Sequence, residues 1–337
     1  MSALAKVRRR ANAARAALAG APVVSGPSGP PAPEPPAVER LPLSPSAEEA
    51  ASAPFVHVRF PPGHYYSPLP DTRELGAEPR HSEIWPAVPR ETLGIDWRDD
   101  EQAALCRDVF AKQQRLDFPD APTGDETEYF TENDQFSPFD AWMLEGFLRH
   151  LRPRRLVEIG SGFSTLVSAR VNREQLDGAM EITCVEPYPR PFLVGGVEGV
   201  GELRIEKVQD TPLEMFEALD RDDVLFIDTS HVAKTGSDVV WLYQEVLPRL
   251  WPGVVVHIHD IFVPGEYPED WVLDGRAWNE LYVVRAFLAF NSAFRIEFGA
   301  QYMLKQHREV VREAFPGMGE ARYARPGGGS LWIRRVT

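Results

Sequence analysis

Short apolar runs alternate with longer amphipathic stretches through the C-terminal part of the chain, from Ser137 onward. The runs predict seven strands, at 154–160, 181–186, 202–208, 223–228, 253–259, 293–299 and 330–335. The stretches between them predict helices at 138–150, 163–172, 189–196, 212–219, 234–250, 277–290 and 304–315. Such alternation is typical of a parallel sheet with helices on both faces, so the sequence predicts a doubly wound, mostly parallel α/β fold.

The first 54 residues carry a different pattern. Residues 1–20 contain five basic side chains and no acid, and residues 21–54 hold ten of the 31 prolines. A segment this poor in large apolar residues cannot bury enough surface to order itself, so 21–54 is predicted to be a disordered linker. The basic arm has two interpretations: it touches an anionic surface such as a membrane, or it is a solvated helix.

Residues 55–136 are predicted to form an N-terminal extension to the folded domain at 137–337. The extension is irregular and rich in aromatic side chains, with one helix expected in GIDWRDDEQAALCRDVF. Its aromatic loops have two interpretations: a lid or substrate wall over a ligand site, or ordinary packing on the sheet. The aromatic residues concerned are Tyr65, Tyr66, Tyr129, Phe130 and Phe136.

Composition excludes several classes of protein. The net charge of −14 argues against a nucleic-acid partner, because such partners are bound through positive charge. No apolar run is long enough to span a bilayer. Two cysteines, Cys106 and Cys184, cannot build a disulfide framework, which suits a reducing cytoplasm. The sequence therefore predicts a cytoplasmic protein without a transmembrane segment.

The most informative stretch is RRLVEIGSGFST, residues 154–165, in which a strand ends in Glu158 and a glycine-rich turn follows. Gly160, Ser161 and Gly162 allow backbone to approach a ligand closely. The dinucleotide fingerprint G-x-G-x-x-G fails because Thr165 occupies the third glycine position. A carboxylate at this place favours a cationic cofactor with a ribose, such as S-adenosylmethionine, over a pyrophosphate.

Further polar residues follow the other predicted strands. Glu186, after the second strand, is placed to accept hydrogen bonds from both ribose hydroxyls. Asp210 could hold the adenine amino group or cap a helix. Because ligands of parallel sheets bind beyond the carboxyl ends of the strands, four groups after strands four and five are expected to converge. These are Asp228, His231, His259 and Asp260. His257, deeper in its strand, is interpreted as a core histidine.

Two chemistries fit that cluster. His231 or His259 could accept the proton of a hydroxyl that is being methylated, with Asp260 orienting the imidazole. Alternatively Asp228, Asp260 and His259 could hold Mg²⁺, which would polarise a hydroxyl. The histidine base is favoured, because the cluster offers only two hard oxygen ligands.

Six stretches in this order resemble one bacterial group of class I S-adenosylmethionine-dependent methyltransferases. They are VEIGSGFST, CVEPYP, VQDTP, FIDTSHVAKTGSDV, VHIHDIFVPGEYP and PGGGSLWIRR. The resemblance implies a seven-stranded Rossmann-like sheet with a closing strand pair. It also implies cofactor binding by Glu158, Gly160, Ser161, Gly162 and Glu186, with Asp228 beside the methionine end. The group is similar to small-molecule and sugar O-methyltransferases, which implies a small-molecule or saccharide acceptor.

Two departures refine this expectation. Metal-dependent relatives carry an acidic pair or Asp-Asn after strand five, whereas this chain has His259-Asp260-Ile261. Amino-group methyltransferases carry an Asn/Asp-Pro-Pro-aromatic motif after strand four, whereas this chain has Asp228-Thr229-Ser230-His231. Two alternatives stay open: a non-catalytic S-adenosylmethionine-binding partner protein, and a nucleotide-dependent oxidoreductase. The sequence does not specify the acceptor or the oligomeric state.

Overall fold

The computed structural model describes residues 59–88, 91–316 and 327–337. Residues Phe60–Thr337 form one compact unit. The predictions for the arm and linker, residues 1–54, lie outside the described residues. Within them, no helix has the length and apolar character that a membrane crossing needs.

The centre of the unit is a seven-stranded sheet in the order β3-β2-β1-β4-β5-β7-β6. The strands are β1 Arg155–Ile159, β2 Glu181–Val185, β3 Glu202–Arg204, β4 Val224–Ile227, β5 Val255–Ile258, β6 Phe294–Gly299 and β7 Leu331–Arg335. Strands β1 to β5 are mutually parallel, and β7 runs antiparallel to both β5 and β6. The predicted fold is therefore confirmed, with a single reversed strand inserted near one edge.

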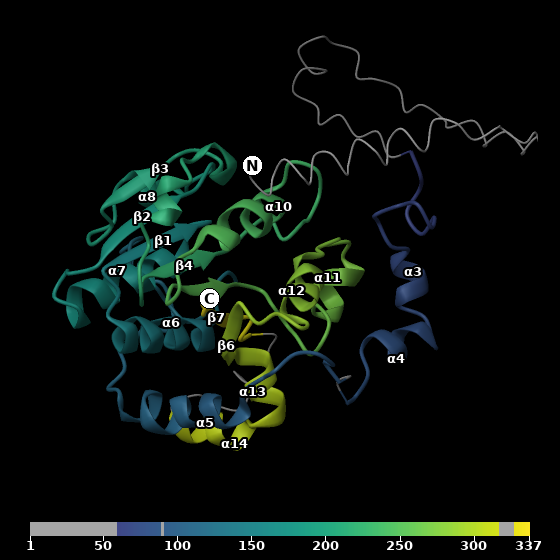
Figure 1. The fold of residues 1–337 in the computed structure, drawn as a ribbon, viewed down its shortest axis with the longest axis horizontal. Helices are drawn as coiled ribbons and strands as arrows, with labels where there is room; N and C mark the ends of the chain where they lie inside the picture. Colours follow the sequence, from purple (N-terminus) through teal and green to yellow (C-terminus); the bar gives the residue numbers. More distant parts are fainter. Residues whose placement is uncertain (1–58, 89–90, 317–326) are drawn as a thin grey trace, which may run out of the picture. The chain divides into compact units, whose positions relative to one another are not determined.

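Helices cover both faces of this sheet (Figure 1). They are α3 Thr72–Leu75, α4 Arg80–Ile84, α5 Asp99–Asp108, α6 Pro138–Leu151, α7 Phe163–Gln175, α8 Pro191–Val194, α9 Glu214–Glu217, α10 Asp238–Trp241, α11 Glu269–Leu273, α12 Glu280–Leu288, α13 Ala300–Gln306 and α14 Arg308–Ala314. Short 3₁₀ turns lie at η1 Phe110–Lys112, η2 Val208–Asp210 and η4 Leu247–Arg249, and a π-helical turn, η3, at Leu242–Val246.

Alternation along the strands divides the core in two. Leu156, with its neighbours on the same face, packs against α6 and α7. Val157 faces the other way, toward the helices α10 and α12. Side chains of adjacent strand residues point to opposite faces, so a strand that is buried on both sides must be apolar throughout. This explains why β1, β4 and β5 read as near-continuous apolar runs.

Several predicted elements are shorter or more broken than the pattern indicated, and three of them have a clear physical reason. The strand expected at 202–208 ends at Arg204, on the sheet edge, where it pairs with β2 alone. The helix expected at 234–250 passes from α10 into η3 and η4, and Pro248 within η4 lacks the N–H that a regular helix needs. The helix expected at 304–315 is two helices, interrupted at His307, whose ring is bonded to Asp99.

The extension packs on the C-terminal half of the sheet. Trp97 stacks on Tyr302 with ring centroids 4.0 Å apart, and the buried Gln102 amide oxygen accepts a hydrogen bond from the Gly299 N–H. The aromatic residues divide between the two interpretations. Tyr129 is a core side chain and Tyr65 is exposed, whereas Phe136 lines the cavity described below.

Candidate active site

The loop from β1 to α7 is fixed by one glycine. Gly160 has φ +77°, a conformation that side chains other than glycine rarely adopt. A Cβ at this position would lie 1.9 Å from the Asp228 carbonyl oxygen. The turn therefore lies directly on the end of β4, which brings the two strand ends together.

A cavity opens above this turn, at the carboxyl ends of β1, β2 and β4. Its walls include the turn itself, Glu186, Asp228 and, from the extension, Gln135 and Phe136. A Cβ at Gly162 would meet no atom within 4 Å, so this part of the turn faces open space. The Glu186 carboxylate accepts hydrogen bonds from the backbone N–H groups of Ser161 (3.2 Å) and Tyr188 (2.7 Å), which holds it at the cavity wall.

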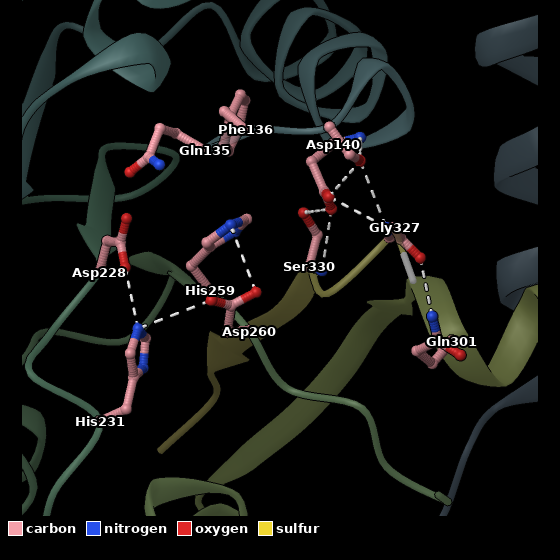
Figure 2. A network of polar contacts seen from close by, with 12 residues as sticks. Gln135, Phe136, Asp140, Asp228, His231, His259, Asp260, Gln301, Gly327 and Ser330 are labelled. Atoms are coloured by element: carbon pink, nitrogen blue, oxygen red, sulfur yellow. Dashed lines mark hydrogen bonds and ion pairs between the residues drawn. The ribbon is translucent and has the colours of Figure 1, made fainter. Parts of the chain in front are cut away.

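Two histidines and two acids meet where β4 and β5 end, as Figure 2 shows. The His231 Nε2 atom lies 3.2 Å from an Asp228 oxygen and 3.7 Å from an Asp260 oxygen. The His259 Nε2 atom lies 3.7 Å from the other Asp260 oxygen. Asp260 thus stands between the two imidazoles. These four side chains, which were expected to converge, lie together, and Asp228 is the one among them that lines the cavity described above.

His231 is held from behind by a buried acid. The Glu280 carboxylate, at the start of α12, lies 2.9 Å from His231 Nδ1 and accepts a 2.5 Å hydrogen bond from the Thr229 hydroxyl. The N–H groups of Asn279 and Glu280 both donate to the His231 carbonyl oxygen. With Nδ1 directed to Glu280, the Nε2 atom is the one directed toward Asp228 and Asp260.

Asp260 is held by the glycine-rich turn before β7. The Ile261 N–H donates to the Gly329 carbonyl at 2.8 Å, and a Cβ at Gly329 would lie 2.9 Å from the Asp260 Cα. The buried Asp140 of α6 fixes this glycine-rich turn, because its carboxylate accepts hydrogen bonds from the N–H groups of Gly328 and Ser330 (Figure 2). Both His231 (φ +57°) and Asp260 (φ +54°) have left-handed backbone, a strained conformation that often occurs at functional sites.

Burial and charge shift the pKa values in this cluster. Burial lowers the pKa of His231, but hydrogen bonds to Asp228 and Glu280 outweigh it, and the pKa lies well above the ordinary value. Burial likewise opposes the Coulombic effect of Asp260 on His259, whose pKa is raised. Burial raises the pKa of Asp260, while that of Asp228 is lowered, because its contact with His231 outweighs burial. The arrangement can therefore hold a proton on either imidazole.

A methyltransferase-domain family matches residues 157–261, which span the turn and both strand ends of the cluster. An uncharacterized protein of Archaeoglobus fulgidus is 36% identical over 167 residues, or 48% of this chain and 75% of that protein. The family match and the strand order β3-β2-β1-β4-β5-β7-β6 together decide the family. The chain belongs to the class I S-adenosylmethionine-dependent methyltransferases.

Solved structures are much more distant. The methyltransferase PaMTH1 of Podospora anserina, bound to S-adenosylhomocysteine, is 14% identical with a TM-score of 0.36, covering 71% of this chain and 88% of its own. An O-methyltransferase of Bacillus cereus with S-adenosylhomocysteine is 13% identical with a TM-score of 0.36, covering 79% and 100%. Similarities of this size carry no argument about the acceptor of this methyltransferase.

Two predicted cofactor residues lie away from the cavity wall. Glu158 is fully buried beneath the turn, where it accepts a 2.5 Å hydrogen bond from the Ser164 hydroxyl. Asp210 is exposed at the end of η2 and does not line the cavity. Their direct contact with the cofactor stays a prediction. His257 is buried and stacked on Phe226 with ring centroids 4.0 Å apart, in the manner expected of a core histidine.

Sequence reasoning missed Glu280 and Asp140, although both fix the cluster. Each lies in the first turn of a helix and far from its partner in the chain, so the sequence pattern indicates only a helix start. The signal that was available is an acid on the buried side of an otherwise apolar helix. Metal binding gains no geometric support: within 59–88, 91–316 and 327–337, no three His, Cys, Asp or Glu side chains are grouped to hold an ion.

Glu158 makes stability depend on pH. Burial raises the pKa of this carboxyl from 4.5 to about 7, although the Ser164 and Thr165 hydroxyls oppose the shift. The folded state therefore binds a proton that the unfolded state releases, and the free energy of unfolding falls as pH rises from 4.5 to about 7. We expect a fall on the order of 3 kcal/mol in urea unfolding, which Glu158→Gln removes.

The matched control for this prediction is Glu181→Gln. Glu181 is exposed at the start of the neighbouring strand β2. This variant should keep the same loss of stability with rising pH as the native protein. An identical pH dependence in the native protein and in Glu158→Gln would contradict the assignment.

Proposed function

We propose that this methyltransferase transfers a methyl group to a hydroxyl oxygen of a small molecule or saccharide, with His231 as the base. The single observation that supports it most is the buried Glu280–His231 pair, in which His231 Nε2 lies 3.2 Å from an oxygen of Asp228, a residue of the cofactor cavity wall. A hydroxyl must lose its proton as it is methylated, and a histidine oriented by a buried carboxylate is suited to accept it.

The cavity residues fit S-adenosylmethionine. Glu186 offers carboxylate oxygens to the ribose hydroxyls, and the open side of Gly162 leaves room for the methionine part. Asp228 supplies negative charge beside the positive sulfonium. When bound, S-adenosylmethionine supplies an electrophilic methyl group. The role of Glu158 is to hold Ser164, and through it the start of α7, from beneath.

His231 is favoured over His259 because its two nitrogens have different partners. Nδ1 faces Glu280, which fixes the tautomer, and Nε2 faces the cavity side, near Asp228. His259 is as buried as His231, lies against Phe136 with ring centroids 5.0 Å apart, and its Nδ1 atom has no hydrogen-bond partner among the described residues. We assign His259 to orienting Asp260, which in turn orients His231.

Glu280→Gln tests this assignment through pH dependence. The raised pKa of His231 means that its neutral, proton-accepting form is populated at higher pH than for an ordinary histidine, so the rise of kcat/KM with pH should be displaced upward. Without the Glu280 charge, the pKa of His231 falls and the rise moves to lower pH. We also expect kcat to drop by about tenfold to a hundredfold, since the ring is less firmly oriented. The measurement is transfer of labelled methyl to hydroxylated metabolites and sugars across a pH series.

A control separates this effect from a structural one. Glu266→Gln alters an acid that pairs with the exposed Tyr282 hydroxyl, outside the cluster, and should leave the profile in place. If Glu280→Gln lowers the rate equally at every pH, Glu280 has only a structural role. Transfer of methyl to amines but not to hydroxyls would refute the acceptor class.

The proposal includes a cytoplasmic location and no nucleic-acid partner. Both cysteines, Cys106 and Cys184, are free and buried, as expected of a protein from a reducing compartment. The net charge of −14 disfavours binding to a polyanion.

A further inference from the structure

A second cavity of 410 Å³ lies between the extension and the segment that leads into α12. One wall is formed by Tyr65, Ser67 and neighbouring residues of the loop before α3, and the other by Arg276, Trp278 and Tyr282. Its size is that of typical small-molecule sites. Its lining shares no residue with that of the cofactor cavity, so the two are separate spaces.

The loop that forms the first wall displays aromatic rings to solvent. Tyr65 is 81% exposed and stacks on His64 with centroids 4.5 Å apart. The loop is nonetheless tightly bonded: the Gly63 N–H donates to the Leu69 carbonyl at 2.9 Å, and the Ser67 N–H to the His64 carbonyl at 2.7 Å. The loop therefore holds aromatic rings in a fixed position beside the cavity.

The second wall joins aromatic and hydrogen-bonding groups. The Arg276 guanidinium lies over Trp271 (4.7 Å) and Trp278 (5.4 Å). Among the described residues no carboxylate pairs with Arg276, so its N–H groups are available at the cavity edge. A guanidinium stacked on indole rings is fixed in orientation and offers a planar set of donors.

This cavity is tied directly to the reaction centre. The Trp278 ring lies 4.4 Å from the His231 ring, between centroids. The next two residues, Asn279 and Glu280, donate their N–H groups to the His231 carbonyl, and Glu280 holds its imidazole. A ligand against Trp278 therefore lies one aromatic ring away from the proposed base.

We propose that this cavity is an acceptor subsite and that it takes a neutral saccharide, an inference that rests on the hydroxyl methylation proposed above. Sugar rings present C–H faces that pack on exposed aromatic rings, and hydroxyl groups that need both donors and acceptors. The cavity supplies the rings of Tyr65 and Trp278, the donors of Arg276 and the carboxylate of Glu74. A flat apolar ligand would leave the Arg276 guanidinium without a hydrogen-bond acceptor, and an anionic one would meet Glu74 and Asp71.

The test is saturation-transfer-difference NMR on the full chain with S-adenosylhomocysteine present. The probes are millimolar cellobiose, maltose and lactose, beside catechol and a phenolic acid. We expect signals from at least one disaccharide. Tyr65→Ala should weaken its binding about tenfold, because a stacked ring is lost, whereas Tyr65→Phe should retain it. Phe290→Ala is the control, since Phe290 is an 89% exposed aromatic outside the cavity lining and should leave binding unchanged.

Each other result overturns the assignment. Signals from the phenols and none from the sugars would show that the ligand is aromatic. Sugar binding that Tyr65→Ala does not weaken would show that the saccharide binds outside this cavity. Calorimetry with S-adenosylhomocysteine on the same samples separates the two levels of the proposal. If the native protein binds S-adenosylhomocysteine but no saccharide, only the subsite proposal is refuted. If the native protein does not bind S-adenosylhomocysteine, the proposed function itself is refuted.

Discussion

Replacing His231 with alanine should lower kcat by roughly 10²- to 10⁴-fold while leaving cofactor affinity nearly unchanged. The imidazole is the group proposed to accept the acceptor's proton, and its Nε2 atom lies 3.2 Å from an Asp228 oxygen. Its loss removes the base but none of the cavity walls that would hold the ribose or the methionine part. The measurements are labelled-methyl transfer to the hydroxylated acceptors and calorimetry with S-adenosylhomocysteine.

Two comparisons make this result specific. His150→Ala changes an exposed histidine of α6 and should leave both quantities unchanged. Added imidazole should restore part of the activity of His231→Ala, because a small base can occupy the space that the side chain leaves. Full activity in His231→Ala, with a large loss in His259→Ala, would transfer the base to His259.

The second large effect is expected at Glu186. Its alanine variant should bind S-adenosylhomocysteine about 100-fold more weakly, because two charge-assisted hydrogen bonds to ribose hydroxyls are lost. The side chain also accepts hydrogen bonds from Ser161 and Tyr188, so alanine could loosen the turn. Glu186→Gln tests this point, since an amide keeps one acceptor for the turn but lacks the charge, and an intermediate loss is expected.

Glu181→Ala is the matched control for Glu186. It removes an exposed carboxylate from the opposite end of the same strand, β2. Calorimetry should give native affinity for this variant. Equal affinity in Glu186→Ala and the native protein would show that the ribose is held by other groups.

The apolar pattern was sufficient to predict the sheet, because its strands are buried on both faces and carry almost no polar interruption. Leu156, Val157 and Ile159 illustrate this, and all three are core residues. Helix limits were harder to predict. The break at His307 depends on a contact with Asp99, more than 200 positions earlier in the chain, and local propensity does not contain such a contact.

In the candidate site, too, the residues on strand ends were predictable, whereas contacts from distant helices were not. Asp228, His231, His259 and Asp260 were predictable as a cluster because parallel neighbours bring their carboxyl ends to one edge. Glu280 was not, because it reaches His231 from a helix outside that edge. Glu158 lies near the carboxyl end of its strand, as the pattern indicated, but its side chain faces α7 rather than the cavity. The sequence of the turn did not specify which face of the sheet this side chain occupies.

The central claim is that the Gly160 turn and Glu186 form a site for S-adenosylmethionine. The most direct measurement is calorimetric titration of the native full-length chain with S-adenosylhomocysteine and, separately, with NAD. We predict micromolar binding of S-adenosylhomocysteine and no binding of NAD, since Thr165 replaces the third glycine that a pyrophosphate site requires. Tight binding of NAD with none of S-adenosylhomocysteine would contradict the account.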